Sequence, residues 1–255
     1  MKCMFMPEQR PPIFYEIHSN LPREGPGDNR STRRAFKMLK DLPASPRILD
    51  IGCGSGMQTV ELAKLSKGSI DAVDRHQPFL DQLTERVRKE GVSRSIRAVK
   101  GDMFNLEYGD GRFDVVWSEG AIFVIGFERG LREWRRMLAE KGYLVVSDLC
   151  WLRDDPPGEV VSWMKAVDPA VKTISENLET AKRCGYRIVG SFVLPDESWW
   201  ENYYGPIEKK LPSIRARHAG DEEALRFVAM EEKEIEMFRR YSKYYGYGFF
   251  VLQVE

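Results

Sequence analysis

Three glycines and an aspartate are grouped between Arg47 and Gly56, in the stretch RILDIGCGSG. The apolar run before the glycines favours a β-strand, and apolar residues at helical spacing begin at Val60. This order predicts a strand, a tight turn and a helix. Glycine permits positive φ and a close approach of backbone to ligand, and the N–H groups opening the next helix face that ligand. The stretch therefore predicts a binding turn that includes Gly52 and Gly54.

The spacing of these glycines separates two classes of nucleotide ligand. A dinucleotide-binding turn reads G-x-G-x-x-G, but here the third glycine comes one position early, at Gly56. In addition, Asp50 lies two residues before the first glycine. A carboxylate there repels a pyrophosphate but attracts an ammonium or sulfonium group. The turn therefore favours a cationic nucleoside over a dinucleotide.

Acidic residues also close the next two expected strands. Residues 69–74 end in Asp74, and residues 96–100 are followed by Asp102. In nucleotide-binding βαβ units, the carboxylate at the end of the second strand binds the two ribose hydroxyls. We therefore expect Asp74 to bind a ribose.

With these acids, residues 47–56 resemble motif I (D-x-G-x-G-x-G) of the class I S-adenosylmethionine-dependent methyltransferases. The resemblance is strong over roughly residues 46–150 and looser over residues 173–255. It implies an α/β fold with a Rossmann-like, seven-stranded, mostly parallel sheet, whose last strand is antiparallel and whose two faces carry helices. It also implies S-adenosyl-L-methionine as the cofactor and S-adenosyl-L-homocysteine as its product.

The resemblance also implies particular cofactor contacts. Asp102 would accept the adenine amino proton, and the backbone N–H of Met103 would meet a ring nitrogen. From the residues themselves, Arg75 and His76 either cover the adenine face or are exposed loop residues, and Arg23 meets a carboxylate if the arm folds over the cofactor cleft. Ser118 ends the expected strand 113–118 beside the methyl-transfer point. The full predicted cofactor-binding set is Arg23, Asp50, Gly52, Cys53, Gly54, Gly56, Asp74, Arg75, Asp102, Met103 and Ser118.

The methyl acceptor is expected to be a small molecule. A sulfonium methyl is already activated, so a general base is needed only if the acceptor is protonated at working pH. The candidates for that base are Glu119, His18 and Tyr204. The residues expected to line the acceptor pocket are Tyr15, Phe123, Trp151, Trp200 and Tyr203.

Four segments are expected from the order of elements. Residues 1–27 are rich in proline and glycine and form an N-terminal arm, which either lies along the surface or covers the cofactor cleft. Residues 28–195 form the cofactor-binding core. Residues 196–245 form a helical insertion, which we interpret as a lid because a short link would close the sheet as well. Residues 246–255 form the last core strand.

Composition excludes several classes of function. Lysine plus arginine equals aspartate plus glutamate at 39 each, so no net field attracts nucleic acid or an anionic membrane. The four cysteines (Cys3, Cys53, Cys150 and Cys184) form no C-x-x-C pair, which argues against a metal site and for a reducing compartment. The first seven residues are too poor in apolar residues for a signal peptide. We expect a cytoplasmic monomer or homodimer that spans no membrane.

Other readings stay open at this point. Glu119 and Glu128 are spaced like the paired glutamates of protein arginine methyltransferases, although Glu128 also suits a helix start. A protein or RNA methyltransferase would need a shallow site with a basic rim. A binding protein that holds S-adenosylmethionine or S-adenosylhomocysteine without turnover would have a closed or filled acceptor pocket.

Overall fold

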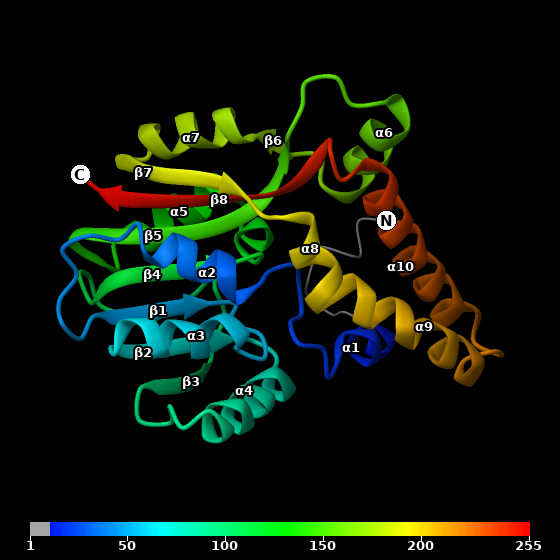
Figure 1. The fold of residues 1–255 in the computed structure, drawn as a ribbon, viewed down its shortest axis with the longest axis horizontal. Coiled ribbons are helices and arrows are strands. Elements are labelled where there is room, and N and C mark those ends of the chain that lie inside the picture. Colours follow the sequence, from blue (N-terminus) through cyan, green and yellow to red (C-terminus); the bar gives the residue numbers. More distant parts are fainter. Residues whose placement is uncertain (1–10) are drawn as a thin grey trace.

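A computed structural model describes residues 11–255. Residues 1–10 of the predicted arm, including Cys3 and the stretch tested for a signal peptide, lie outside the described residues. The described chain forms one mixed sheet with a layer of helices on each face and a helical lid at one end (Figure 1).

The sheet has the order β3-β2-β1-β4-β5-β8-β7, and a two-residue strand, β6, pairs with the far end of β5. β1 to β5 are parallel neighbours, whereas β8 lies antiparallel between β5 and β7. The predicted sheet with an antiparallel last strand is confirmed, and β6 is a small addition to it. The strands are β1 (Arg47–Ile51), β2 (Ser69–Asp74), β3 (Ile96–Lys100), β4 (Phe113–Glu119), β5 (Leu138–Trp151), β6 (Lys172–Thr173), β7 (Tyr186–Val193) and β8 (Tyr245–Val254).

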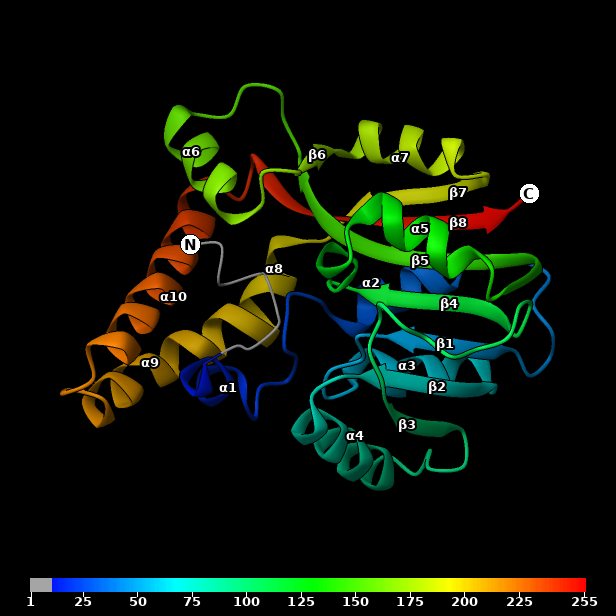
Figure 2. The ribbon, with the colours of Figure 1, turned by 180° about the vertical axis from the view of Figure 1, so that it is seen from behind.

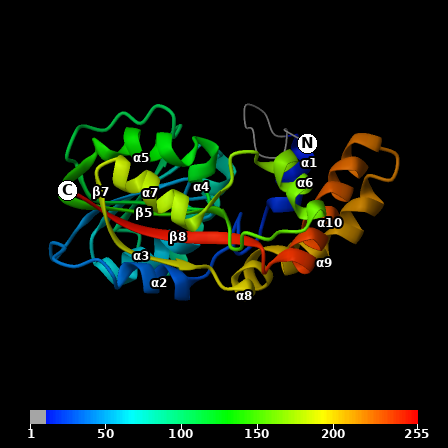
Figure 3. The same ribbon diagram turned by 90° about the horizontal axis from the view of Figure 1, so that it is seen from above.

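Helices cover both faces of the sheet because its central strands are apolar on both sides. α2 (Asn29–Phe36) and α3 (Met57–Ser66) lie on one face, and α5 (Phe127–Arg135) and α7 (Ile174–Arg183) lie on the other (Figure 3). α4 (Gln77–Lys89) packs beside α3 through Leu80 and Leu83. Val115 and Trp117 of β4 face the first layer, and Val116 faces the second, as the alternation of a strand requires.

The lid lies beyond the carboxyl ends of β1, β2 and β4 (Figures 1 and 2). Between β7 and β8 the chain forms α8 (Asp196–Trp199), a π-helical turn η2 (Trp200–Tyr204), α9 (Gly205–Arg217) and α10 (Glu222–Tyr241). Two short helices from elsewhere join it, namely α1 (Pro12–His18) from the arm and α6 (Gly158–Val167), which follows β5. The lid is therefore assembled from three separate parts of the chain.

Candidate functional site

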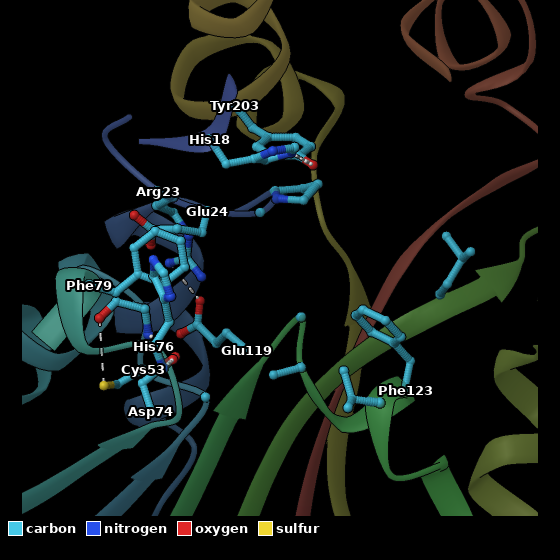
Figure 4. Close-up of a pocket in the computed structure, with 18 of the residues that line it drawn as sticks. His18, Arg23, Glu24, Cys53, Asp74, His76, Phe79, Glu119, Phe123 and Tyr203 are labelled. Atoms are coloured by element: carbon cyan, nitrogen blue, oxygen red, sulfur yellow. Dashed lines mark hydrogen bonds and ion pairs between the residues drawn. The ribbon is translucent and has the colours of Figure 1, made fainter. Parts of the chain in front are cut away.

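An open cavity of about 1670 Å³, including its mouth, lies between the carboxyl ends of the strands and the lid (Figure 4). Its sheet half is lined by residues from the ranges 23–26, 51–58, 73–79, 101–104 and 119–124. Its lid half is lined by residues from 14–18, 149, 163–167, 199–204, 231–234 and 245–247.

The glycine turn forms the floor of the sheet half. Gly52 and Gly54 have φ values of 71° and 53°, in the left-handed region that glycine tolerates. A Cβ on Gly52 would lie 2.5 Å from the Cβ of Ala121, which follows β4. The N–H groups of Gly52 and Cys53 donate to the carbonyl of Val73 in the neighbouring strand, at 2.8 and 3.0 Å. The turn is thus held against two strand ends, with no space for a side chain at Gly52.

Asp74 lies at the rim of this turn. One of its carboxylate oxygens accepts the N–H of Gly54 at 3.0 Å, and the other accepts the N–H of His76 at 2.8 Å. The Asp74 side chain lines the cavity, as do Arg75, Asp102 and Met103. Asp102 also accepts the N–H of Phe104 at 3.0 Å and so caps its own turn.

Asp50, in contrast, lies behind the turn. It is fully buried and does not line the cavity. Its carboxylate accepts the hydroxyl of Thr59 at 2.6 Å and the amide of Gln58 at 3.3 Å. The pKa of Asp50 is raised to about 7, mainly by burial and further by the charge of Glu119. Its present contacts connect β1 to α3.

The arm contributes a carboxylate that the sequence analysis did not single out. Glu24 accepts the N–H of Ser55 at 2.8 Å, and its Oε2 would lie only 2.3 Å from a Cβ on Gly54. Its other oxygen, Oε1, is buried and has no hydrogen-bond partner among the described residues. Burial raises the pKa of Glu24. Arg23 stands next to it and is 4% exposed.

Arg23 connects the arm to the end of β4. Its Nη1 lies 3.1 Å from Oε2 of Glu119, an ion pair that Figure 4 draws as a dashed line. The other oxygen of Glu119 accepts the indole N–H of Trp117 and the hydroxyl of Thr32, both at 2.8 Å. Glu119 therefore receives donors from the arm, α2 and β4 at once, and in this arrangement it fixes the arm over the sheet.

Aromatic residues close the side of the cavity near β2. The rings of Tyr15 and His76 are stacked with centroids 3.9 Å apart, and Phe79 meets His76 edge-on at 4.5 Å. Tyr15 comes from α1, whereas His76 and Phe79 follow β2. The stack therefore joins the arm to the sheet half and presents flat apolar surface beside Asp74.

His18 and Tyr203 face each other in the lid half (Figure 4). Nδ1 of His18 donates to the carbonyl of Phe14 at 2.9 Å, so in the neutral ring Nε2 is the accepting nitrogen. The hydroxyl of Tyr203 lies 3.2 Å from that Nε2, and Glu231 Oε1 lies 3.8 Å from it. Tyr204 donates to Glu234 at 2.9 Å.

Comparison with characterised proteins agrees with this architecture. Residues 48–142 match a family model described as a methyltransferase domain. The glycine turn, Asp74 and Asp102 all fall inside the matched range, in the order that the fold requires.

Residues 48–142 form a class I methyltransferase domain.

Relatives of the domain support the same assignment. Methyltransferase GfsG of Streptomyces halstedii is 29% identical over 121 residues, which are 47% of this chain and 43% of that protein. Sterol 24-C-methyltransferase erg-4 of Neurospora crassa is 27% identical over 175 residues, 65% of this chain and 46% of that protein. The chain thus spans less than half the length of these two relatives.

A solved structure covers the chain more fully. A methyltransferase from Geobacter sulfurreducens, in complex with S-adenosyl-L-homocysteine, matches 96% of this chain and 98% of its own length, with a TM-score of 0.83 and 22% identity. This match includes the lid as well as the methyltransferase domain. At that identity the agreement is one of fold.

The cavity brings together most of the predicted residues but not all. Asp50, Gly56, Ser118, Trp151 and Trp200 do not line it. Ser118 donates to the carbonyl of Ile51 at 2.9 Å inside the sheet. Trp200 lies under the guanidinium of Arg239, 4.8 Å from its ring centroid, away from the cavity. The predicted residues that do line it are Tyr15, His18, Arg23, Gly52, Cys53, Gly54, Asp74, Arg75, Asp102, Met103, Glu119, Phe123, Tyr203 and Tyr204.

His76, which was expected with Arg75 either to cover the adenine face or to lie in an exposed loop, lines the cavity. Sequence reasoning missed Glu24, Glu231 and Glu234. A signal for the last two exists in α10. Phe227, Val228, Ile235 and Phe238 form its apolar stripe, and positions 231 and 234 fall on that stripe. Acidic residues in such places are informative because they bring charge to a buried face.

Residues 11–255 hold neither a metal-binding cluster nor a membrane-spanning helix. No group of three or more histidine, cysteine, aspartate or glutamate residues is arranged to hold a metal ion. None of the helices in this range combines the length and apolarity needed to cross a bilayer.

Proposed function

We propose that this protein transfers a methyl group from S-adenosyl-L-methionine to a small molecule. The observation that carries the proposal is the two-part cavity. Its sheet half has a glycine turn rimmed by Asp74, and its lid half is lined by aromatic side chains. The predicted cytoplasmic location and monomeric or homodimeric state remain part of this proposal.

The residues of the sheet half fit this cofactor. Asp74 would accept both ribose hydroxyls, and Asp102 with Met103 would meet the adenine; all three residues line the cavity. The left-handed glycines bring backbone, rather than side chains, against the ligand. At the amino-acid end, the buried Oε1 of Glu24 is a carboxylate oxygen without a partner among the described residues, which suits the cofactor's ammonium group.

When bound, the cofactor supplies a methyl group on a positively charged sulfur. The chain's own contribution is to orient the two ligands and exclude water. The arm does both, since Arg23 and Glu119 hold it across the mouth of the sheet half. Orientation of this kind lowers a reaction barrier by roughly 7–11 kcal/mol.

His18 is the best-placed proton acceptor for an acceptor that needs one. Its Nδ1 is committed to the Phe14 carbonyl, so Nε2, which lies 3.2 Å from the hydroxyl of Tyr203, is the nitrogen able to accept a proton. Tyr204 is less suitable because burial, aided by the charge of Glu234, raises its pKa well above the ordinary value and so keeps it protonated. Glu119 is less suitable because three donors already engage its oxygens.

Calorimetric titration with S-adenosyl-L-homocysteine tests the assignment. We expect Asp74→Ala to weaken binding about tenfold or more, which corresponds to about 1.4 kcal/mol. Asp71→Ala is the matched control, because Asp71 lies on the same strand but pairs with Arg97 on the surface. Equal S-adenosyl-L-homocysteine affinity in the two variants would show that Asp74 does not bind the cofactor.

Transfer itself is tested by incubating the protein and labelled cofactor with a metabolite extract. The proposal expects label in a small molecule. Cofactor binding with no labelled product from any extract would favour a binding protein without turnover.

A further inference from the structure

Arg86 is a partly buried arginine of α4 whose guanidinium faces the N-terminal arm. Its Nη1 and Nη2 both donate to the carbonyl of Pro22, each at 3.1 Å. Burial lowers the pKa of Arg86, and the charge of Glu24 acts in the opposite direction. Arg88, two positions along the same helix, is instead exposed and pairs with Glu85 at 2.8 Å. Since a partly buried guanidinium loses hydration that an exposed one keeps, α4 holds the arm at a cost in free energy.

The hydrogen bonds from Arg86 fix the middle of the arm. Before this point, Lys210 of α9 donates to the carbonyl of Ser19 at 2.7 Å, and after it the N–H of Gly27 donates to a carbonyl of α8 at 3.2 Å. Both of these contacts are with the lid. Between them, the backbone of residues 22–24 has one hydrogen-bonding partner among the described residues, the guanidinium of Arg86. Arg86 is therefore the contact that holds this stretch of backbone to the core rather than to the lid.

Glu24 is the residue whose position depends most on this stretch of backbone. Its Oε2 accepts the N–H of Ser55 at 2.8 Å, in the glycine turn, while its Oε1 is buried without a hydrogen-bond partner among residues 11–255. Burial raises the pKa of Glu24, and the bond from Ser55 and the charges of Arg23 and Arg86 oppose that rise. A carboxylate that binds an ammonium group must be both correctly placed and ionised. Arg86 meets both needs, since it fixes the backbone two residues away and supplies positive charge.

We propose that Arg86 is a positioning residue for the cofactor: by holding the carbonyl of Pro22, it places Glu24 against the cofactor's ammonium group. The inference rests on the proposed function, since it concerns how the same sheet half binds S-adenosyl-L-methionine. Arg86 does not line the cavity and acts through the arm. A displacement of about 1 Å is enough to lose much of such a contact. Loss of Arg86 should therefore weaken binding of the amino-acid end of the ligand and leave binding of the adenosine end unchanged.

Two ligands that share an adenosyl thioether test this proposal. S-adenosyl-L-homocysteine carries the amino-acid end, whereas 5′-methylthioadenosine ends in a methyl group. Each is titrated calorimetrically into the native full chain and into Arg86→Met, which keeps a stem of similar length and removes the charge and the donors. We expect this variant to bind S-adenosyl-L-homocysteine about tenfold more weakly than the native chain does, and to bind 5′-methylthioadenosine within about twofold of it.

Further variants assign the effect to the guanidinium. Arg86→Lys restores a cationic donor on a similar stem, and is expected to bind S-adenosyl-L-homocysteine about threefold or more tightly than Arg86→Met does. A role in packing alone would give these two variants the same affinity. Arg88→Met, at an exposed position of the same helix, is expected to bind both ligands as the native chain does. If Arg86→Met does not fold by circular dichroism, Arg86→Gln replaces it, with the same expected loss.

The possible failures are distinguishable. If S-adenosyl-L-homocysteine does not bind the native chain, the proposed function fails and the role of Arg86 fails with it. If it binds, the proposed function stands. The role of Arg86 is then overturned if its neutral variant binds S-adenosyl-L-homocysteine as tightly as the native chain, or loses affinity for both ligands to the same extent. It is also overturned if the lysine variant binds no better than the neutral one, or if Arg88→Met shows an equal loss.

Discussion

The two halves of the cavity are built in different ways from the same chain. The sheet half takes its residues mainly from the ends of consecutive parallel strands, which the fold must bring to one edge. The lid half takes its residues from α1, α6, η2, α10 and the start of β8, which are far apart in sequence. One half therefore follows from the sheet topology, and the other depends on how a particular set of helices packs.

This difference separates the part of the site that lies inside the matched methyltransferase domain from the part that lies mainly outside it. The family model matches residues 48–142, which supply most of the sheet half and include every residue predicted to bind the cofactor except Arg23. Glu231 and Glu234 belong to the insertion, and the aromatic residues of the lid half come from the insertion, α1, α6 and β8. Substitutions in the sheet half should therefore change cofactor binding and leave acceptor binding unaltered. Substitutions in the lid half should do the reverse.

The largest expected effect is at the floor of the sheet half. Gly52→Ala adds a Cβ where Ala121 leaves no space, and should weaken S-adenosyl-L-homocysteine binding about a hundredfold or more, about 2.7 kcal/mol, by calorimetry. Gly111→Ala is the control, since Gly111 also has positive φ (64°) but nothing within 4 Å of a Cβ. Both variants should lose about 1–2 kcal/mol of folding stability from backbone strain. Similar affinities in the two would show that the turn does not contact the cofactor.

A smaller effect tests whether the arm belongs to the sheet half. Glu24→Gln keeps the hydrogen bond to Ser55 but removes the charge offered to the cofactor's ammonium. We expect this variant to bind S-adenosyl-L-homocysteine about thirtyfold more weakly in calorimetry, a loss of about 2 kcal/mol. Glu16→Gln, on the same arm but paired with Arg217 at the surface, should bind as the native chain does. If Glu24→Gln binds S-adenosyl-L-homocysteine as tightly as the native chain does, then the arm covers the cavity without contacting the cofactor's ammonium group.

A different kind of effect, on folding stability rather than on binding, concerns the acid behind the turn. Asp50 titrates near 7 in the folded chain and near 3.8 when unfolded, so between these values the folded state holds the extra proton. Folding stability must then fall as pH rises from about 4 to about 7, by at most about 1.4 kcal/mol per pH unit for this group. Asp148, whose pKa burial also raises to about 7, adds a similar slope.

Urea unfolding at several pH values checks this assignment. Asp50→Asn should reduce the slope of the free energy of unfolding against pH by the contribution of Asp50. Asp148→Asn should reduce the same slope by the contribution of Asp148. A slope in Asp50→Asn identical to that of the native chain would contradict the proton-holding role of Asp50.

The sheet and much of its site could be predicted from the sequence, because strand ends carry their residues to a fixed edge. Asp74 and Asp102 line the cavity for this reason. Asp50 was predicted beside them, but alternation along β1 turns it behind the glycine turn, toward Thr59. Arg23 was expected to meet a carboxylate, and in the described structure that carboxylate is Glu119.

The lid half could be predicted only in outline. The aromatic cluster 199–204 was visible, but which rings face inward depends on the π-helical turn, which directs Tyr203 to the cavity and leaves Trp200 outside it. Glu231 and Glu234 would have required reading α10 for acids on its apolar stripe. Glu24 gave no local signal, because its role comes from a contact between segments 31 positions apart.

The two stems of the insertion leave and rejoin the sheet as hydrogen-bonded neighbours. Val193, the last residue of β7, pairs with Gly248 of β8, and the N–H of Leu194 donates to the carbonyl of Tyr247 at 2.8 Å. A segment whose ends are already adjacent can change length at little cost in loop entropy. We therefore expect that exchanging residues 195–244 changes what the lid half binds and leaves the sheet half of the cavity intact.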